Sequence, residues 1–344
     1  MQFSKKKVAV IFVVSLLILA GITVMSGFKH YSRIYDDNVS KETAYQLTIS
    51  SNFNFDSVLL HLTSDSVLLN YDNFEWVVEK MNYRNHVKPG IYELKPGMNN
   101  REIVRMLRSG MPPVRLIFNS LRTKEDLVKI IGEQLEMSPS NLLSLLNDKN
   151  YVSEKGLTIE NVVSVFIPNT YEVYWDTKPR DLIDRMIEEH AKFWSKKRSA
   201  KAESVALTPL EVATLASIVE QEYKFADEAP RIAGVYLNRL QRGMKLDADP
   251  TLIFALGDFT LKRVLNKHKK IDSPYNTYKN KGLPPGPICL PSITTIDAVL
   301  NAENHEYIFF CAKADFSGYH NFSKSYRQHK IYARQYQAEL KKLN

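Results

Sequence analysis

A glutamate, Glu220, follows a segment whose pattern predicts a buried helix. Residues 208–223 read TPLEVATLASIVEQEY, and Thr208, Pro209 and Glu211 form the capping pattern of a helix start. Apolar residues then recur at helical spacing: Val212, Leu215, Ala216 and Val219. Because Glu220 follows this apolar face, we expect burial to disfavour its charged form and to raise its pKa. A carboxylic acid of that kind can donate a proton near neutral pH, whereas a solvated glutamate at a helix end would have no such role.

A second glutamate, Glu222, follows two residues later in the same segment. Two residues along a helix correspond to a rotation of about 200°, which places Glu222 on the opposite side from Glu220. We therefore interpret Glu222 as the structural partner of an arginine, such as Arg231 or Arg239.

Further blocks downstream carry polar and aromatic residues in a fixed order. After ASIVEQE at residues 216–222 come IAGVYLNRLQRGM, DADPT, YNTY, GLPPGPI and YHNFS. Together these blocks resemble the MltG/YceG-like endolytic murein transglycosylases. The resemblance is strong over residues 205–344 and extends more weakly back to about residue 40. It implies that Glu220 is the catalytic glutamate.

The same resemblance implies a set of substrate-binding residues in the YNTY and YHNFS blocks. These are Tyr275, Asn276, Tyr278 and His320. Tyrosine rings can cover the apolar faces of sugars while their hydroxyls form hydrogen bonds. We therefore predict that Tyr275, Tyr278 and His320 line one cleft with Glu220. The alternatives are that a tyrosine only packs and that His320 makes a structural hydrogen bond.

The DADPT block adds Asp249 and Thr251 to the substrate-binding residues that the resemblance implies. Asp249 precedes a proline, which is also the pattern of a helix N-cap followed by proline at the first helical position. Asp249 is therefore either a cap or a residue of the site.

The reaction implied by the resemblance needs one acid and no metal or organic cofactor. Glu220 would protonate the oxygen of the MurNAc–GlcNAc β-1,4 bond. It would then act as a base while the muramyl 6-hydroxyl closes on its own anomeric carbon, leaving a 1,6-anhydro-MurNAc end. Cleavage within nascent glycan strands would end their elongation, with peptidoglycan synthases as partners. The alternatives are a hydrolytic muramidase, which needs a second carboxylate or an activated water, and a non-catalytic peptidoglycan-binding scaffold.

The N-terminus has the pattern of a membrane anchor. Lys5, Lys6 and Lys7 precede an uncharged, mostly apolar run at residues 8–28. About 20 such residues span the hydrocarbon core as a helix, and the preceding lysines favour the cytoplasm. We predict a cytoplasmic tail at residues 1–7, a single span at 8–28 in the cell membrane and the rest of the chain outside. A cleaved signal peptide would have a shorter apolar core of about 7–15 residues and an A-x-A-like site.

The remaining chain is expected to have an α+β fold, because short strands and helices mix without regular βαβ alternation. Residues 87–110 resemble the LysM-like portion of the same family, which implies a module at 42–113 that binds N-acetylglucosamine polymers or serves as a spacer. A connecting helical region at 114–204 and a catalytic domain at 205–344 follow.

Hydrophobic periodicity and capping residues predict the individual elements. Asn100, Thr123 and Ser138 are the expected helix caps, and residues 196–204 are expected to form a loop. The sequence predicts a strand at 115–118 and a hairpin that pairs residues 306–311 with 319–322. Further expected elements are a strand at 91–94 and helices at 56–62, 71–81, 124–135, 139–146, 182–194, 230–242 and 323–343.

Composition limits the possible partners. With 44% hydrophobic and 24% charged residues, the chain can build cores and is not disordered as a whole. Its net charge of +8 would suit nucleic acid, an anionic membrane or an acidic polymer. No zinc-ligand cluster, phosphate-binding glycine loop or RNA-binding signature accompanies the charge, so we predict no nucleic-acid partner. Cys289 and Cys311 are either a disulfide or two free thiols, and their spacing does not indicate a metal site.

Overall fold

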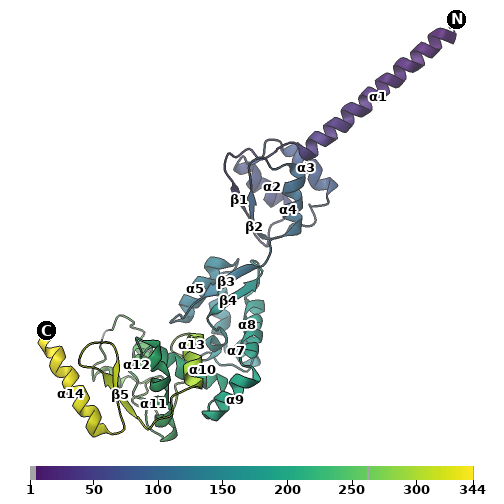
Figure 1. Cartoon of the computed structure of the whole chain (residues 1–344). Helices are drawn as coiled ribbons and strands as arrows, with labels where there is room; N and C mark the ends of the chain where they lie inside the picture. Colours follow the sequence, from purple (N-terminus) through teal and green to yellow (C-terminus); the bar gives the residue numbers. More distant parts are fainter. Residues whose placement is uncertain (1–4, 262, 344) are drawn as a thin grey trace. The chain divides into compact units, whose positions relative to one another are not determined.

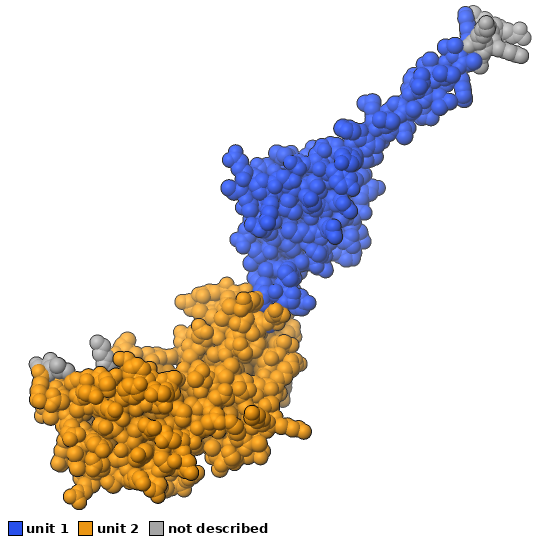
Figure 2. Space-filling view, viewed as in Figure 1, with its two compact units in different colours: residues 1–114, 173–176 blue, residues 115–172, 177–344 orange. Residues whose placement is uncertain are grey.

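The computed structural model describes residues 5–261 and 263–343, and it divides into two compact units (Figures 1 and 2). Unit 1 contains residues 1–114 and 173–176, and unit 2 contains residues 115–172 and 177–344. The first residues of the predicted cytoplasmic tail, 1–4, lie outside the described residues. The fold is a mixture of helices and short strands, as predicted.

Unit 1 begins with the long helix α1 (Lys5–Tyr35), which contains the predicted span at residues 8–28. The segment Ala9–Tyr35 is long and apolar enough to cross a membrane. Its large apolar side chains, such as Phe12 and Leu17, are exposed. Exposed apolar side chains over this length are typical of a helix that faces lipid.

The remainder of unit 1 has the order strand, helix, helix, strand, helix. The elements are β1 (Tyr45–Ile49), α2 (Phe55–Ser64), α3 (Tyr71–Lys80), β2 (Gly90–Leu94) and α4 (Asn100–Ser109). β1 and β2 pair antiparallel, with Leu47 opposite Tyr92. The predicted helices and the strand at 91–94 are confirmed, but the helix cap is Asn99 rather than Asn100. Asn99 forms a capping box with Glu102, and Asn100 is the first helical residue. β1 was not predicted, although buried Leu47 and Ile49 alternate with exposed residues.

The next part of the chain, nearly all of it in unit 2, is mainly helical. Its elements are β3 (Val114–Phe118), α5 (Lys124–Gln134), α6 (Pro139–Leu146), α7 (Lys149–Glu154), η1 (Val162–Val165), β4 (Asn169–Val173), α8 (Pro179–Phe193) and α9 (Lys196–Ser204). β3 pairs with β4. Thr123 caps α5 as predicted, whereas Ser138 makes no capping hydrogen bond to α6. The loop predicted at 196–204 is wrong, because this polar segment is helix α9. Its Ala202 is buried and its Arg198 forms an ion pair with Asp297, so tertiary contacts stabilise it.

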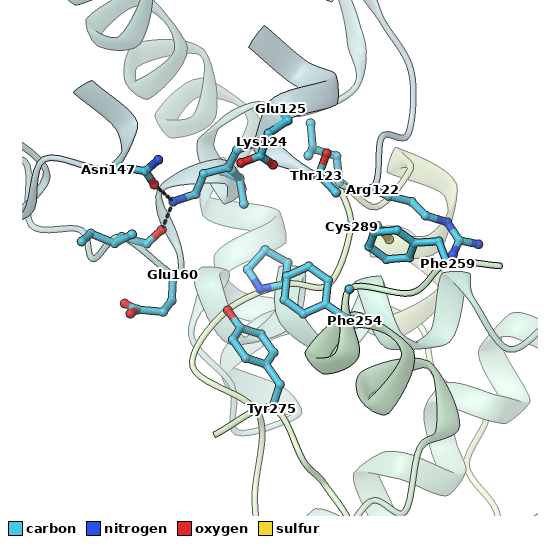
Figure 3. Close-up of a pocket in the computed structure, with 15 residues that line it drawn as sticks. Arg122, Thr123, Lys124, Glu125, Asn147, Glu160, Phe254, Phe259, Tyr275 and Cys289 are labelled. Atoms are coloured by element: carbon cyan, nitrogen blue, oxygen red, sulfur yellow. Dashed lines mark hydrogen bonds between the residues drawn. The ribbon is translucent and has the colours of Figure 1, made fainter. Parts of the chain in front are cut away.

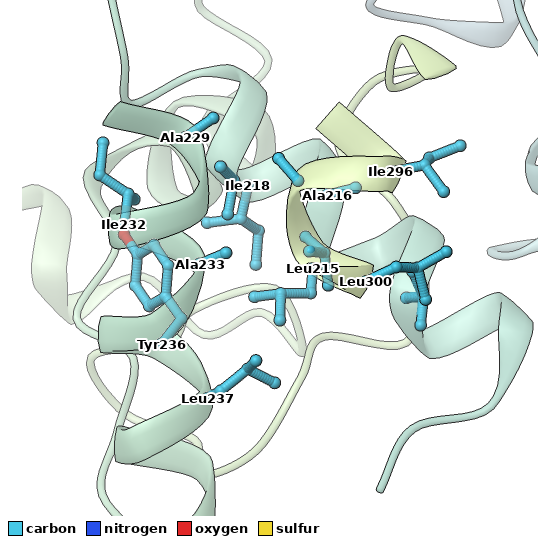
Figure 4. Packing of buried hydrophobic residues seen from close by; sticks show 14 of the residues in the cluster. Leu215, Ala216, Ile218, Ala229, Ile232, Ala233, Tyr236, Leu237, Ile296 and Leu300 are labelled. Carbon is cyan, nitrogen blue, oxygen red and sulfur yellow. The ribbon is translucent and has the colours of Figure 1, made fainter. Parts of the chain in front are cut away.

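The second part of unit 2 is built around α10 (Pro209–Glu220), whose residues from Val212 to Val219 are all buried. Figure 4 shows side chains of α11 (Ala229–Gln241) and α13 (Ile293–Leu300) packed against it, with Ile232 from α11 and Ile296 from α13. The unit also contains helices α12 (Asp249–Leu256) and α14 (Tyr326–Leu343) and the hairpin of β5 (Phe309–Ala312) and β6 (His320–Ser323). Two short helices, η2 (Ala226–Glu228) and η3 (His268–Lys270), complete it. The hairpin is confirmed, with Phe310 opposite Phe322.

The two cysteines of unit 2 are free thiols. Cys289 is buried, and burial raises its pKa to about 12. Burial also raises the pKa of Cys311. Because the thiolate is the reactive form of cysteine, neither side chain has the surroundings of a nucleophile.

Candidate active site

Glu220 is the last residue of α10, and its carboxylate is bound by the start of α13. Its Oε2 accepts hydrogen bonds from the backbone nitrogen of Ser292 at 3.3 Å and from the Ser292 hydroxyl at 2.9 Å. The Thr295 hydroxyl also donates to this oxygen. Ser292 is the N-cap of α13, and the Tyr223 hydroxyl lies 2.7 Å from Thr295 Oγ1. Glu220 therefore joins the end of one buried helix to the beginning of another.

Glu222 lies beyond the end of α10 and lines a cavity of about 490 Å³. Among the residues that the structure describes, the lining of this cavity does not include Glu220. The residues that line it include three acidic side chains, two cationic ones and several aromatic rings. They include Glu222, Asp249, Arg239, Lys269, Tyr278, Phe310 and Tyr326. Such a cavity has the size and the polar and aromatic lining of a small-ligand site.

The carboxyl group of Glu222 has the surroundings of a proton donor. Burial, with a smaller effect of the nearby Asp249 charge, raises its pKa to about 7. The buried Tyr236 of α11 donates a hydrogen bond from its hydroxyl to Glu222 Oε1 at 2.6 Å, which opposes the rise. A carboxyl group with a pKa near 7 is partly protonated at neutral pH, as general acid catalysis requires.

The contacts of Glu222 correct the prediction that it pairs with Arg231 or Arg239. Arg231 Nε lies 2.8 Å from Glu303 Oε2, and Arg239 Nη2 lies 2.7 Å from Asp247 Oδ2. Arg239 also donates to the Leu246 carbonyl. The prediction assumed that the helix continues through Glu222, but α10 ends at Glu220. Past this end the chain turns, and Glu222 accepts a hydrogen bond from the Tyr236 hydroxyl instead.

Asp249 and Tyr278 lie in the same cavity as Glu222, whereas the prediction placed Tyr278 in a cleft with Glu220. The Tyr278 hydroxyl donates to Asp249 Oδ1 at 2.6 Å, and the Lys269 ammonium lies 4.3 Å from the Tyr278 ring centre. The N-cap of α12 is Ala248, so Asp249 is the first helical residue and not the cap. The Asp249 carboxylate therefore accepts a hydrogen bond from Tyr278 in the cavity and does not cap the helix.

Asn276 and Thr251, by contrast, are buried and have their polar atoms used within the protein. The Asn276 amide donates to two backbone carbonyls, at 3.0 and 2.7 Å, and its oxygen accepts from the Tyr278 backbone nitrogen. The Thr251 hydroxyl donates to the Ala248 carbonyl at 2.7 Å and lies 2.8 Å from the Thr277 hydroxyl. This corrects their predicted role, because both residues hold the loop that positions Tyr278 and neither is available to a substrate.

Tyr275 lines a different cavity, of about 400 Å³, which Figure 3 shows. Its ring centre is 4.7 Å from that of Phe254, and the two rings lie beside each other in the view. Lys124, in the same lining, donates to Asn147 Oδ1 at 2.8 Å. Among the described residues, Glu220 does not line this cavity either. Tyr275 is thus separated from Tyr278 although only two residues lie between them.

His320 makes the structural hydrogen bonds that were the alternative to a substrate contact. Its Nδ1 lies 2.9 Å from Glu228 Oε2, and its backbone nitrogen donates to Glu228 Oε1 at 3.0 Å. The side chain of Glu228 is only 5% exposed. The ring of His320 meets Phe310 edge-on, with centroids 5.3 Å apart, and Phe310 lines the Glu222 cavity. The predicted common cleft of Glu220, Tyr275, Tyr278 and His320 is therefore not what the structure shows.

Tyr236 was not predicted as a site residue, although the sequence contains a signal for it. It occupies a core position of α11, among Ile232, Ala233 and Leu237. A buried tyrosine hydroxyl usually has a hydrogen-bond partner. A tyrosine in an otherwise apolar helix face therefore indicates a nearby polar group, which here is Glu222.

The sequence and fold together define the class of protein. A sequence model of the YceG-like family matches residues 47–335, and the chain belongs to this family. The endolytic murein transglycosylase of Bacillus subtilis (strain 168) is 27% identical over 326 residues, which cover 89% of each chain. The protein of the same name from Streptococcus pneumoniae serotype 2 (strain D39 / NCTC 7466) is 25% identical over 336 residues. These residues are 88% of this chain but 61% of that relative.

A solved structure shares the fold. The crystal structure of a putative YceG-like protein from Listeria monocytogenes is 26% identical and superposes with a TM-score of 0.56. The match covers 85% of this chain and 99% of that one. The family that the sequence blocks predict is confirmed.

Proposed function

We propose that this chain is a membrane-anchored endolytic murein transglycosylase, a lyase that cleaves peptidoglycan. Membership of the YceG-like family and the names of the relatives support the activity. The observation that carries the assignment of the site is the cavity that contains Glu222, a carboxyl group with a pKa near 7 beside aromatic side chains. The sequence favours Glu220 as the acid, whereas the contacts of the two glutamates favour Glu222.

In this proposal the protonated Glu222 donates its proton to the oxygen of the MurNAc–GlcNAc β-1,4 bond. Positive charge develops at the anomeric carbon as the bond breaks, and the Asp249 carboxylate in the same cavity stabilises it. The Glu222 carboxylate then accepts the proton of the muramyl 6-hydroxyl, whose oxygen bonds to that carbon. The products are a free GlcNAc hydroxyl and a 1,6-anhydro-MurNAc end, and Glu222 is protonated again.

A hydrolytic muramidase is the second candidate, and the position of Asp249 favours it. Asp249 lines the same cavity as Glu222 and is near enough to raise its pKa. Two carboxyl groups at one site are the usual requirement for hydrolysis of a glycosidic bond. Purified peptidoglycan should therefore be digested with the protein and the products weighed. Anhydro ends support the transglycosylase, products heavier by one water support the muramidase, and bound but uncut glycan indicates a scaffold.

We place the substrate in nascent glycan strands near the membrane, so that cleavage ends strand elongation beside peptidoglycan synthases. Unit 1 would contribute by binding N-acetylglucosamine polymers through the LysM-like module at 42–113. Its two antiparallel strands, β1 and β2, separated in sequence by two helices, support this assignment. Retention of the whole protein on N-acetylglucosamine polymer beads, and its release by soluble oligomers of the same sugar, would test the module.

The proposed topology gives a direct prediction. If α1 is a single span with the N-terminus in the cytoplasm, the chain beyond about residue 29 lies on the outer side of the cell membrane, where peptidoglycan is found. Protease added to spheroplasts should then degrade the chain beyond about residue 29 while the membrane stays intact. A cytoplasmic protein followed in the same samples is the control for leakage. Complete protection of the chain would contradict both the topology and access to peptidoglycan.

The pH dependence of cleavage should identify the acid. Since Glu222 must be protonated to act, and its pKa is about 7, the rate is expected to fall as the pH rises through that value. The hydrogen bond from Tyr236 lowers the pKa of Glu222. Tyr236→Phe should therefore raise the pKa and move the alkaline limb of the pH–rate profile to higher pH.

The matched control for this change is Tyr223→Phe, which removes a phenol hydroxyl that contacts Thr295 near Glu220. The alkaline limb should stay at the wild-type pH in this variant. A shift in Tyr223→Phe together with none in Tyr236→Phe would indicate that Glu220 is the acid.

A further inference from the structure

Unit 1 contains a cavity of about 440 Å³ where the end of α1 lies beside α3. One face of α1 supplies most of its lining, and α3 contributes Asn73. The lining residues from α1 occur in an ordered sequence. Val24, Met25 and Phe28 come first, and Lys29, Ser32 and Arg33 follow toward the C-terminal end of the helix. The cavity therefore changes from apolar to cationic along the helix axis.

This change falls where the predicted span ends, at residue 28. The apolar part then lies at the depth of the acyl chains, and Lys29 and Arg33 lie at the depth of lipid headgroups. Trp76 of α3 lies at the same level as these cations. His30 stacks on its ring with centroids 5.1 Å apart. Tryptophan beside basic residues is typical of the membrane–water interface.

Arg33 has a hydrogen-bond donor for which no described residue supplies an acceptor. Its Nε–H group is buried and lacks a hydrogen-bond partner among the described residues, and its guanidinium lies 5.4 Å from the Trp76 ring centre. Lys80, which lies outside the cavity lining, approaches the same ring at 5.6 Å. Protein atoms cover this Nε–H group, so Trp76 rather than a hydrogen bond at Nε holds the Arg33 side chain at the cavity.

We propose that this cavity binds an anionic phospholipid of the outer leaflet. An acyl chain lies along Val24 and Phe28, and the phosphate accepts hydrogen bonds from Lys29, Arg33 and the Asn73 amide. This inference rests on the proposed membrane anchoring and topology. Bound in this way, the lipid fixes unit 1 against the membrane surface from which α1 emerges.

The charge of the site favours a single phosphodiester over the diphosphate of a polyprenyl-linked glycan. The hydroxyl of Ser32, a lining residue, donates to the Asp36 carboxylate, so this hydroxyl is already engaged with an acidic group. Two cations with an acid beside them match one negative charge better than the higher charge of a diphosphate.

The test uses the full chain in a neutral detergent, with lipid retention followed by native mass spectrometry. Phosphatidylglycerol and phosphatidylcholine with the same acyl chains are the probes. We expect one phosphatidylglycerol to be retained in preference to phosphatidylcholine. Lys29→Gln combined with Arg33→Gln should reduce this preference about 30-fold, or about five-fold for each charge removed. Arg33→Lys, which keeps the charge, should retain most of the preference.

The matched control is Lys95→Gln combined with Arg105→Gln, which removes the same charge from exposed positions of unit 1 outside the cavity lining. Its preference should equal that of the wild type. If the double variant of the cavity loses its fold, Lys29→Gln alone, at an exposed side chain, should still show the five-fold loss.

Three results would overturn the site: equal retention of the two lipids, unchanged preference in the Lys29 and Arg33 variants, or displacement of phosphatidylglycerol by an equal amount of a polyprenyl diphosphate. Because lipid retention is measured without peptidoglycan, a protein that retains lipid but does not cleave would contradict the proposed enzyme and leave the lipid site standing.

Discussion

Glu222→Gln is expected to keep the fold and to abolish cleavage of peptidoglycan. Glutamine has nearly the shape of glutamate, and its amide oxygen can still accept the Tyr236 hydroxyl hydrogen bond, which is 2.6 Å long in the wild type. It cannot donate an acidic proton to the glycosidic oxygen. General acid catalysis contributes about 10²–10⁴-fold, and the loss should be at the upper end because the same group also serves as the base. The rate of formation of anhydro-muramyl ends from purified sacculi measures the effect.

Glu220→Gln is the matched control, since it makes the same chemical change two residues away. Its amide oxygen can accept hydrogen bonds from Ser292 and Thr295, so the link between α10 and α13 should largely survive. We expect this variant to cleave sacculi at a readily measured rate. Circular dichroism would establish that both variants are folded. Near-normal cleavage by folded Glu222→Gln, with none by folded Glu220→Gln, would return the role of the acid to Glu220.

The element that the sequence predicts best is α10, because several independent signals agree there. Thr208 and Glu211 form the capping box that their spacing predicts, and the apolar face from Val212 to Val219 is buried. The hairpin of β5 and β6 is also predicted, since Gly318 marks a turn between an apolar run and the segment that returns beside it. Helix α9 is missed because it is stabilised by tertiary contacts, the ion pair of Arg198 and the burial of Ala202. A local sequence pattern does not indicate such contacts.

The site was harder to predict because its motifs mix residues with different tasks. Asn276 and Tyr278 belong to one block, yet the first binds backbone groups within the loop while the second lines the cavity. Both tasks use polar side chains, so residue type does not distinguish them. The choice between Glu220 and Glu222 depends on where α10 ends. Helix ends are set by a few hydrogen bonds, and an error of two residues there is enough to exchange the surroundings of the two glutamates.

Glu220→Ala should destabilise unit 2 while leaving the proton donor in place. The change removes the acceptor for the Ser292 hydroxyl and backbone nitrogen and for the buried Thr295 hydroxyl. A buried donor that loses its acceptor costs about 1–3 kcal/mol of stability. For a domain of this size, each kcal/mol lowers the melting temperature by about 2–4 °C, so thermal unfolding should show a clear shift.

Glu203→Ala is the control for this prediction, because Glu203 is an exposed glutamate on the neighbouring helix α9. Its free energy of unfolding should change by no more than about 0.5 kcal/mol. Below its melting temperature, Glu220→Ala should still produce anhydro-muramyl ends, since Glu222 and Tyr236 do not depend on the Ser292 contact. A variant with wild-type stability and no cleavage would mean that the Glu220 carboxylate acts on the substrate rather than on α13. The hydrogen bonds at the start of α13 would then describe a resting arrangement that the substrate displaces.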